Sequence, residues 1–159
     1  MSYLSDEAAK KAIITALNKF MADSAVAYIK IHGFHWNVVG PHFKQLHALF
    51  EEHYTNLWKS LDTIAERIRA LGGKAPGSFG DLLNHANIIR EIDTLPHAEI
   101  MLRIAHEDYT LLSLEAHKVE KIAEEHGDTF TVDMMTQRVG DLEKMIWMTL
   151  AHLQGSERL

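Results

Sequence analysis

Four side chains that commonly bind metal ions lie in two pairs along residues 43–71. His47 is followed four residues later by Glu51, and Asp62 is followed four residues later by Glu66. Residues spaced by four lie on the same face of an α-helix, so the two side chains of each pair can reach a common point. At about 100° of helix per residue, both pairs fall on one flank, beside an apolar stripe centred on Phe50. Each pair therefore predicts part of a metal site.

The separation of the two pairs indicates that a second subunit is needed. The step of 15 residues from His47 to Asp62 corresponds to about 22 Å of helix at about 1.5 Å per residue. One metal ion cannot bind both pairs of the same chain over that distance. If a second copy of the helix ran antiparallel about a twofold axis, its Asp62–Glu66 pair would lie opposite the His47–Glu51 pair of the first copy. The spacing thus predicts a dimer with two equivalent sites.

A fifth ligand is expected from the preceding helix. His35 lies near the predicted end of that helix, where a tight turn would bring it beside His47. Two imidazoles with three carboxylates suit iron, manganese or zinc, and such a set can keep positions open for an oxidant. We interpret the set His35, His47, Glu51, Asp62 and Glu66 as a site for the redox chemistry of iron.

A solvent-exposed helix flank is the simpler interpretation of the same residues. Asp62 and Glu66 lie close in sequence to Arg67 and Arg69, and such neighbours often form ordinary surface ion pairs. Trp58, which lies between the two pairs on the same flank, favours a buried contact between subunits instead. The spacing by itself leaves both interpretations open.

Four long amphipathic segments and one short one are expected to position these residues. Apolar side chains recur at helical intervals through each long segment, and Gly and Pro residues separate the segments. The expected helices cover about 6–37 with Ser5 as N-cap, from after Gly40-Pro41 to 71, from near Pro96 to near Gly127, and from about Thr129 onward, with a short helix over 78–86 in the long connection. This pattern predicts an all-α, four-helix bundle, with residues 1–159 forming one domain.

Composition narrows the classes of function. The chain contains no cysteine, which removes thiolate metal sites and favours a reducing compartment. It begins without a signal-type leader and contains no apolar stretch of bilayer length, so we expect a cytoplasmic protein without a membrane partner. The net charge of −6 argues against a general attraction to nucleic acid.

Several motifs resemble the Dps family of mini-ferritins across nearly the whole chain. They surround the predicted ligands and continue to the C-terminal helix. The matching residues are His35-Trp36-Asn37-Val38 with Gly40, then Phe43 and Leu46-His47, then Asp62-Thr63-Ile64-Ala65-Glu66-Arg67 with Leu71-Gly72-Gly73, and finally Ile146-Trp147-Met148 with Ala151-His152-Leu153.

The resemblance implies a ferritin-like four-helix subunit, with a short extra helix between helices 2 and 3, that assembles as a hollow dodecamer. It implies that His35, His47 and Glu51 of one subunit and Asp62 and Glu66 of its neighbour form a dinuclear iron site. The implied activity is a ferroxidase that oxidises Fe²⁺, preferably with hydrogen peroxide, and stores ferric mineral in the shell, which protects against oxidative damage. Zinc or manganese are expected as surrogates for iron.

The same resemblance implies roles for a few residues outside the predicted ligand set. Trp36 beside His35 is expected mainly to pack at the end of its helix, with interception of stray oxidising equivalents as the functional alternative. Asp128 and Asp133 lie where family members have acidic residues lining threefold pores, although an aspartate at a helix start also complements the helix dipole. The remaining histidines, among them His32 and His53, receive no role.

The resemblance also raises DNA condensation as an alternative function. Family members that bind DNA directly use a mobile basic tail, whereas this chain has Asp6 and Glu7 before Lys10-Lys11 and a short, nearly neutral C-terminus. We therefore expect iron handling without strong DNA binding. The ligand types are also compatible with a non-redox buffer for divalent metals, and the helical pattern with a purely structural bundle.

Overall fold

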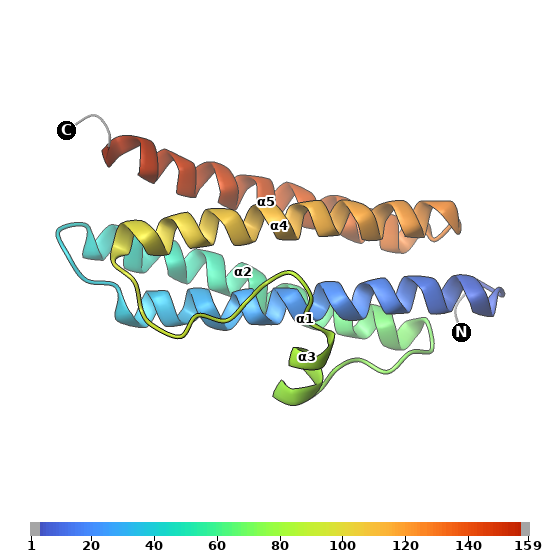
Figure 1. Ribbon diagram of the computed structural model, residues 1–159. Helices are drawn as coiled ribbons and strands as arrows, with labels where there is room; N and C mark the ends of the chain where they lie inside the picture. Colours follow the sequence, from blue (N-terminus) through green and yellow to red (C-terminus); the bar gives the residue numbers. More distant parts are fainter. Residues whose placement is uncertain (1–3, 157–159) are drawn as a thin grey trace.

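The computed structural model describes residues 4–156, which form five α-helices. They span Glu7–Asn37 (α1), Phe43–Ala70 (α2), Phe79–His85 (α3), Ala98–Glu125 (α4) and Thr129–Ser156 (α5). α1 and α2 form one antiparallel pair, and α4 and α5 form a second pair that packs against the first (Figure 1). The short α3 lies beside α1, within the long connection between α2 and α4. The predicted all-α, four-helix bundle with a short extra helix is confirmed.

The start of α1 differs from the prediction by one residue. Asp6, rather than Ser5, is the N-cap, and its carboxylate accepts a 2.9 Å hydrogen bond from the backbone N–H of Ala8. An aspartate here also places a negative charge at the positive end of the helix dipole, which a serine does not. The prediction of Ser5 as the cap is therefore wrong.

α2 and α4 end in the same backbone arrangement. Each helix is followed by a glycine with positive φ, +93° at Gly72 and +72° at Gly127. After α4, the N–H of Gly127 donates to the carbonyl of Glu124 at 3.0 Å, and the N–H of Asp128 donates to that of Ala123 at 2.8 Å. These two bonds satisfy the last carbonyls of a helix when a left-handed residue follows it. They reverse the chain sharply, so α5 can begin at once.

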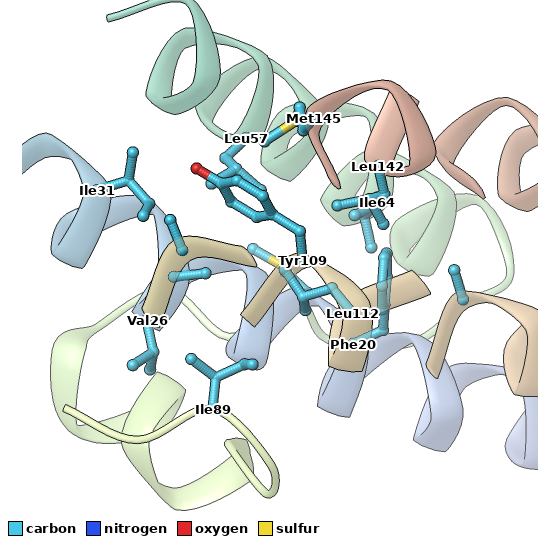
Figure 2. Close-up of a cluster of buried hydrophobic side chains, with 14 of the residues drawn as sticks. Phe20, Val26, Ile31, Leu57, Ile64, Ile89, Tyr109, Leu112, Leu142 and Met145 are labelled. Carbon is cyan, nitrogen blue, oxygen red and sulfur yellow. The ribbon is translucent and has the colours of Figure 1, made fainter. Parts of the chain in front are cut away.

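The four long helices meet around a core of buried apolar side chains (Figure 2). Tyr109 is fully buried within it, and its hydroxyl lies 3.2 Å from Nδ1 of His53. Among residues 4–156, no helix combines the length and apolar character needed to cross a membrane. Each long helix contributes to the core: Phe20 and Ile31 from α1, Leu57 and Ile64 from α2, Tyr109 and Leu112 from α4, and Leu142 and Met145 from α5.

One carboxylate attaches the connection between α3 and α4 to α1. Asp23 is fully buried, and its Oδ1 accepts three backbone hydrogen bonds of 2.9 to 3.0 Å. This one oxygen satisfies all three backbone N–H groups. The connection, which has no helical hydrogen bonds of its own, is therefore held in one conformation. The donors belong to Asn87, Ile88 and Ile89.

A buried ion pair connects α1 to α4. Lys30 Nζ lies 2.7 Å from Asp108 Oδ2, and both side chains are almost inaccessible to solvent. Burial raises the pKa of Asp108, although the hydrogen bond and the positive charge of Lys30 act in the opposite direction. Each charge depends on the other, because either one alone would be buried without a partner.

Candidate metal centre

The turn between α1 and α2 brings His35 and His47 together. α1 ends at Asn37 and α2 begins at Phe43, with Gly40 at φ +118° in the turn between them. The two imidazole rings are stacked, with centroids 3.7 Å apart and planes inclined by 20°. The expected approach of the two histidines is present within one chain.

Each histidine is oriented by the backbone of the other. His35 Nδ1 lies 2.8 Å from the carbonyl oxygen of His47, and His47 Nδ1 lies 2.8 Å from the carbonyl oxygen of His35. A carbonyl oxygen can only accept, so each Nδ1 carries the hydrogen, and in the neutral ring each Nε2 keeps its lone pair. Within residues 4–156 neither Nε2 makes a hydrogen bond. Both rings are therefore prepared to bind a metal ion through Nε2.

Neighbouring rings restrict the movement of this pair. His35 is only 9% exposed, and His47 is half-buried. The ring of Phe43 lies 5.0 Å from that of His47, and Tyr54 meets the His35 ring edge-on at 5.2 Å. The imidazoles are thus packed as well as hydrogen-bonded, which lowers the entropy lost when they bind a ligand.

Asp62 and Glu66 do not reach the histidine pair of their own chain, and Glu51, one turn after His47, does not complete a cluster of three ligands with it. Glu51, Asp62 and Glu66 are exposed along α2, which runs without interruption from 43 to 70. In the described part of the chain, no three His, Asp or Glu side chains gather closely enough to hold a metal ion. One subunit assembles only the imidazole half of the predicted set.

Asp62 and Glu66 do not form the surface ion pairs with Arg67 and Arg69 that the simpler interpretation expects. Arg67 binds a carboxylate at the start of α5, and Arg69 Nη1 donates to a backbone carbonyl beyond α2. Neither arginine contacts the two acidic residues, whose carboxylates form no ion pair within residues 4–156. They are free to face another chain.

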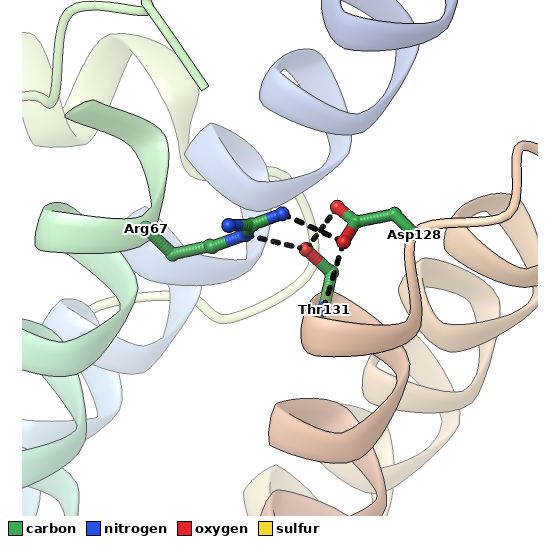
Figure 3. Close-up of polar contacts among 3 residues, drawn as sticks. All are labelled: Arg67, Asp128 and Thr131. Carbon is green, nitrogen blue, oxygen red and sulfur yellow. Dashed lines mark hydrogen bonds and ion pairs between the residues drawn. The ribbon is translucent and has the colours of Figure 1, made fainter. Parts of the chain in front are cut away.

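Asp128 forms an ion pair with Arg67 and does not face open solvent (Figure 3). Its side chain is fully buried, Arg67 Nη2 donates to it at 2.6 Å, and the backbone N–H of Thr131 donates at 3.2 Å. Burial alone would raise the pKa of Asp128, but the hydrogen bonds from Arg67 and Thr131 lower it below its usual range. The pore expectation therefore does not fit this residue, which caps α5. Asp133, in contrast, is exposed.

An exposed apolar face lies beside Asp62. We use this name for Ile29, Trp58, Phe79 and Leu83, whose side chains are 40, 58, 82 and 47% exposed. They line a pocket of about 420 Å³ between α1, α2 and α3, and Trp58 also borders a second pocket together with Asp62. Large apolar side chains that gather on a surface mark contact sites for other molecules.

His32 was not predicted to have a role, yet its ring contacts several aromatic side chains beside the histidine pair. Its ring stacks on Tyr54 at 3.8 Å and lies 4.1 Å from the ring of Trp36, which is 59% exposed. Its Nδ1 lies 3.2 Å from the hydroxyl of Tyr28. Burial lowers the pKa of His32, and the charge of His35 adds to the effect. In the sequence, the four-residue spacing of Tyr28, His32 and Trp36 was the signal that could have indicated this cluster.

Comparisons with known proteins agree with this architecture. The ferritin-like domain family matches residues 14–159. DNA protection during starvation protein 2 of Bacillus anthracis is 39% identical over 143 residues, which are 90% of this chain and 97% of that protein. The crystal structure of antigen TpF1 from Treponema pallidum is 35% identical and superposes with a TM-score of 0.89, covering 96% of this chain and 98% of TpF1.

A third relative carries a chemical description. The crystal structure of a Dps protein from Vibrio cholerae, described as a member of a broad superfamily of ferritin-like diiron-carboxylate proteins, is 29% identical with a TM-score of 0.88. It covers 96% of this chain and 99% of the Vibrio chain. The family match, the sequence identity and the shared fold together place this chain in the Dps family of ferritin-like proteins.

Proposed function

We propose that this protein is an iron-sequestering ferroxidase whose site forms between two subunits. His35, His47 and Glu51 of one subunit would bind Fe²⁺ together with Asp62 and Glu66 of the next. The observation that carries the proposal is the histidine pair, in which both Nδ1 atoms are tied to backbone carbonyls and both Nε2 atoms are left for a metal. Histidines fixed in this way are typical of metal ligands.

The exposed apolar face supports an interface at this place. Trp58 lies between the His47–Glu51 pair and the Asp62–Glu66 pair of α2, close to where the twofold axis of an antiparallel helix pair would pass. Covering its 58% exposed side chain together with Phe79 removes apolar surface from water, which favours association. The same contact would bring the Asp62 and Glu66 carboxylates of each subunit toward the histidine pair of its neighbour.

The mixed ligand set suits iron oxidation. Three carboxylates offset most of the charge of two Fe²⁺ ions, and the imidazoles complete the set while leaving positions for an oxidant. We expect hydrogen peroxide to be that oxidant: two Fe²⁺ each give one electron, and one peroxide takes up both electrons and two protons to become water. The ferric product would be stored as mineral within a hollow dodecamer, so that iron and peroxide are removed together.

Subunit mixing tests the proposal directly. His47→Ala and Asp62→Ala each damage every site of their own homo-oligomer, because each site takes residues from two chains. In a mixed dimer, one site combines the intact histidines of the Asp62→Ala chain with the intact carboxylates of the His47→Ala chain. If chains pair at random, half of the dimers are mixed and each has one intact site, so activity should return to about a quarter of the wild-type value.

The assay is oxidation of Fe²⁺ by peroxide, followed anaerobically by ferric absorbance on co-expressed, separately tagged chains. Glu51→Ala removes another proposed ligand and should slow oxidation. Glu52→Ala is its matched control, because the two neighbours point to different sides of α2, and it should leave the rate unchanged. Mixed oligomers no more active than either parent would rule out the shared site. Tight metal binding without oxidation by the wild type would favour a non-redox buffer for zinc or manganese instead.

Strong DNA binding is not part of the proposal. Lys10, near the N-terminus, is paired with Glu7 at 2.8 Å, and the large basic side chains Arg67 and Arg138 are mostly withdrawn into the bundle. Affinity for DNA depends on several accessible cations acting together. We expect no mobility shift of plasmid DNA at physiological salt, and a clear shift would restore DNA condensation as a function.

A further inference from the structure

Three ring side chains follow one another along α1 and end beside the histidine pair. Tyr28, His32 and Trp36 are spaced by four residues, so they lie on one face of the helix. The ring centroids of Tyr28 and His32 are 5.6 Å apart, and those of His32 and Trp36 are 4.1 Å apart. Rings at such distances are in contact. A continuous row of rings therefore leads from the exposed Trp36 to the half-buried Tyr28.

A tyrosine of α2 connects this row to the proposed iron ligands. The ring of Tyr54 stacks on that of His32 with centroids 3.8 Å apart, and it meets the ring of Tyr28 edge-on at 6.4 Å. Tyr54 also lies 5.2 Å from the ring of His35, which is one of the two stacked histidines. Tyrosine and tryptophan rings can each give up a single electron, and electrons pass readily between rings in contact. The cluster can therefore carry an electron between Tyr28 and the surroundings of His35.

The hydroxyl of Tyr28 has a proton acceptor beside it. It lies 3.2 Å from Nδ1 of His32, and when the neutral imidazole carries its hydrogen on Nε2, Nδ1 accepts from the hydroxyl. A phenol that loses an electron becomes a strong acid, so its oxidation is easier where a base lies within hydrogen-bond reach. The hydroxyl of Tyr54 has no such acceptor in the described part of the chain. Among these rings, Tyr28 is therefore the favoured place for a missing electron.

A second tyrosine–histidine pair lacks the connection to the iron ligands. The hydroxyl of Tyr109 also lies 3.2 Å from a histidine Nδ1, that of His53, but Tyr109 is fully buried in the core. Among residues 4–156, the only ring that contacts either member of this pair is that of the other. No row of rings joins Tyr109 to His35 or to the surface. Tyr109 is therefore a matched control for Tyr28.

We propose that Tyr28 and His32 form a redox-active pair that takes up single oxidising equivalents released beside the iron site. The inference rests on the proposed function, because iron and peroxide supply the oxidant. Peroxide that meets two Fe²⁺ takes up an electron from each. Peroxide that meets a single Fe²⁺ takes up one electron, and the products are Fe³⁺, hydroxide and a hydroxyl radical. The pair acts on this radical.

Each electron and proton of this reaction has a defined donor and acceptor. The hydroxyl radical takes one electron from Trp36 and becomes hydroxide. Trp36 regains an electron from Tyr28 across the His32 ring, and the hydroxyl proton of Tyr28 moves to His32 Nδ1, which leaves a neutral tyrosyl radical. A second Fe²⁺ then gives its electron to Tyr28 while His32 returns the proton. In sum, one peroxide oxidises two Fe²⁺ and becomes two hydroxides, the side chains are restored, and no radical is released.

The first experiment tests the pair without iron, so its outcome does not depend on the proposed function. The assembled, iron-free protein is illuminated with a ruthenium tris-bipyridine photo-oxidant and persulfate, and the trapped radicals are identified by electron paramagnetic resonance. Tyr28→Phe should lose most of the tyrosyl signal, because a phenyl ring has no hydroxyl proton to release, whereas Tyr109→Phe should keep it. A signal unchanged in Tyr28→Phe would refute the pair. A signal lost in Tyr54→Phe and kept in Tyr28→Phe would assign the radical to Tyr54 and refute it equally.

Further variants test the path and the proton acceptor. Trp36→Phe should lower the tyrosyl yield, whereas Trp147→Phe, which removes a tryptophan of similar exposure on α5, should not; the two side chains are 59 and 65% exposed. His32→Phe keeps a ring in the row but removes Nδ1, so the radical should stay on tryptophan and its lifetime should lengthen about tenfold or more. Equal effects of Trp36→Phe and Trp147→Phe, or a tyrosyl yield unchanged in His32→Phe, would contradict the mechanism.

The last experiment connects the pair to iron. Substoichiometric Fe²⁺ is mixed with excess peroxide, a spin trap records the hydroxyl radical that escapes, and the amount is divided by the iron oxidised. Tyr28→Phe should release several times more radical per iron than the wild type or Tyr109→Phe. Equal release would refute a role for the pair beside the iron site. A wild type that oxidises no iron would refute the proposed ferroxidase, whereas the iron-free experiment would still decide whether the pair is redox-active.

Discussion

His53 should make the bundle sensitive to mild acid. It is 1% exposed, its Nδ1 lies 3.2 Å from the hydroxyl of the buried Tyr109, and its Nε2 has no partner within residues 4–156. Burial lowers the pKa of His53 from 6.5 to about 4, and the positive charges of His152 and Lys144 act in the same direction. The native core therefore holds the neutral ring.

The pKa values determine the size of the effect. Between pH 6.5 and about 4 the unfolded chain binds a proton at this histidine while the native chain does not, so stability falls as the pH is lowered through this window. Above pH 6.5 both states are neutral, and His53 contributes no pH dependence. At pH 5 the difference corresponds to about 2 kcal/mol per chain, approaching about 3 kcal/mol near pH 4.

The variant that tests this is the double substitution His53→Phe with Tyr109→Phe. Changing both residues avoids leaving the tyrosine hydroxyl buried without a partner. Urea unfolding at one protein concentration, at pH 7.5 and pH 5, should show a loss of stability in the wild type that is about 2 kcal/mol per chain larger than in the variant.

The chain contains other histidines, so only the difference between the two proteins reports on His53. Hydrogen–deuterium exchange at its ring carbon, read by mass spectrometry, gives the pKa of the single residue as an independent check. A wild type and a variant with the same loss between pH 7.5 and pH 5 would contradict the reasoning. So would a measured pKa near 6.5.

Two further predictions concern the buried charges. Asp23→Ala should lower the free energy of unfolding by about 2 to 4 kcal/mol, because three backbone donors lose their acceptor. Limited proteolysis of this variant should begin in the connection at 86–97. Cleavage there at the wild-type rate would show that the Asp23 carboxylate does not hold the connection in place. Lys30→Met should cost about 3 kcal/mol or more by leaving Asp108 unpaired, whereas adding Asp108→Leu should recover most of the loss in a double-mutant cycle read by urea unfolding. Additive losses would contradict the coupling of the two charges.

The helices were predictable because their burial follows simple periodicity. Apolar residues recur at helical spacing in all four long segments, and glycines such as Gly72 and Gly127 mark where segments end. The N-terminal boundary was less certain, because Ser5 and Asp6 are both good caps and the choice depends on the backbone of one residue. The short α3 was predictable from the length of the connection, which is too long to remain without structure.

The site was only partly predictable for a geometric reason. The approach of His35 to His47 follows from one turn between adjacent helices, and spacing along α2 separates Asp62 and Glu66 from them. Contacts between helices that are distant in sequence have no such local signature. Periodicity therefore could not distinguish the buried His53 and Arg138 from ordinary surface residues, nor the stacking of His32 on a ring of α2.

The crossed hydrogen bonds of His35 and His47 have a consequence for sequence divergence. Each imidazole is oriented by a main-chain carbonyl, and no substitution removes a carbonyl from the backbone. The residues of the intervening turn can therefore change while the rings keep their orientation, provided that the number of residues between the two histidines is kept. A single insertion or deletion there would shift both carbonyls relative to both rings. For this half of the site, the length of the turn must be kept during divergence, whereas its amino acids can change.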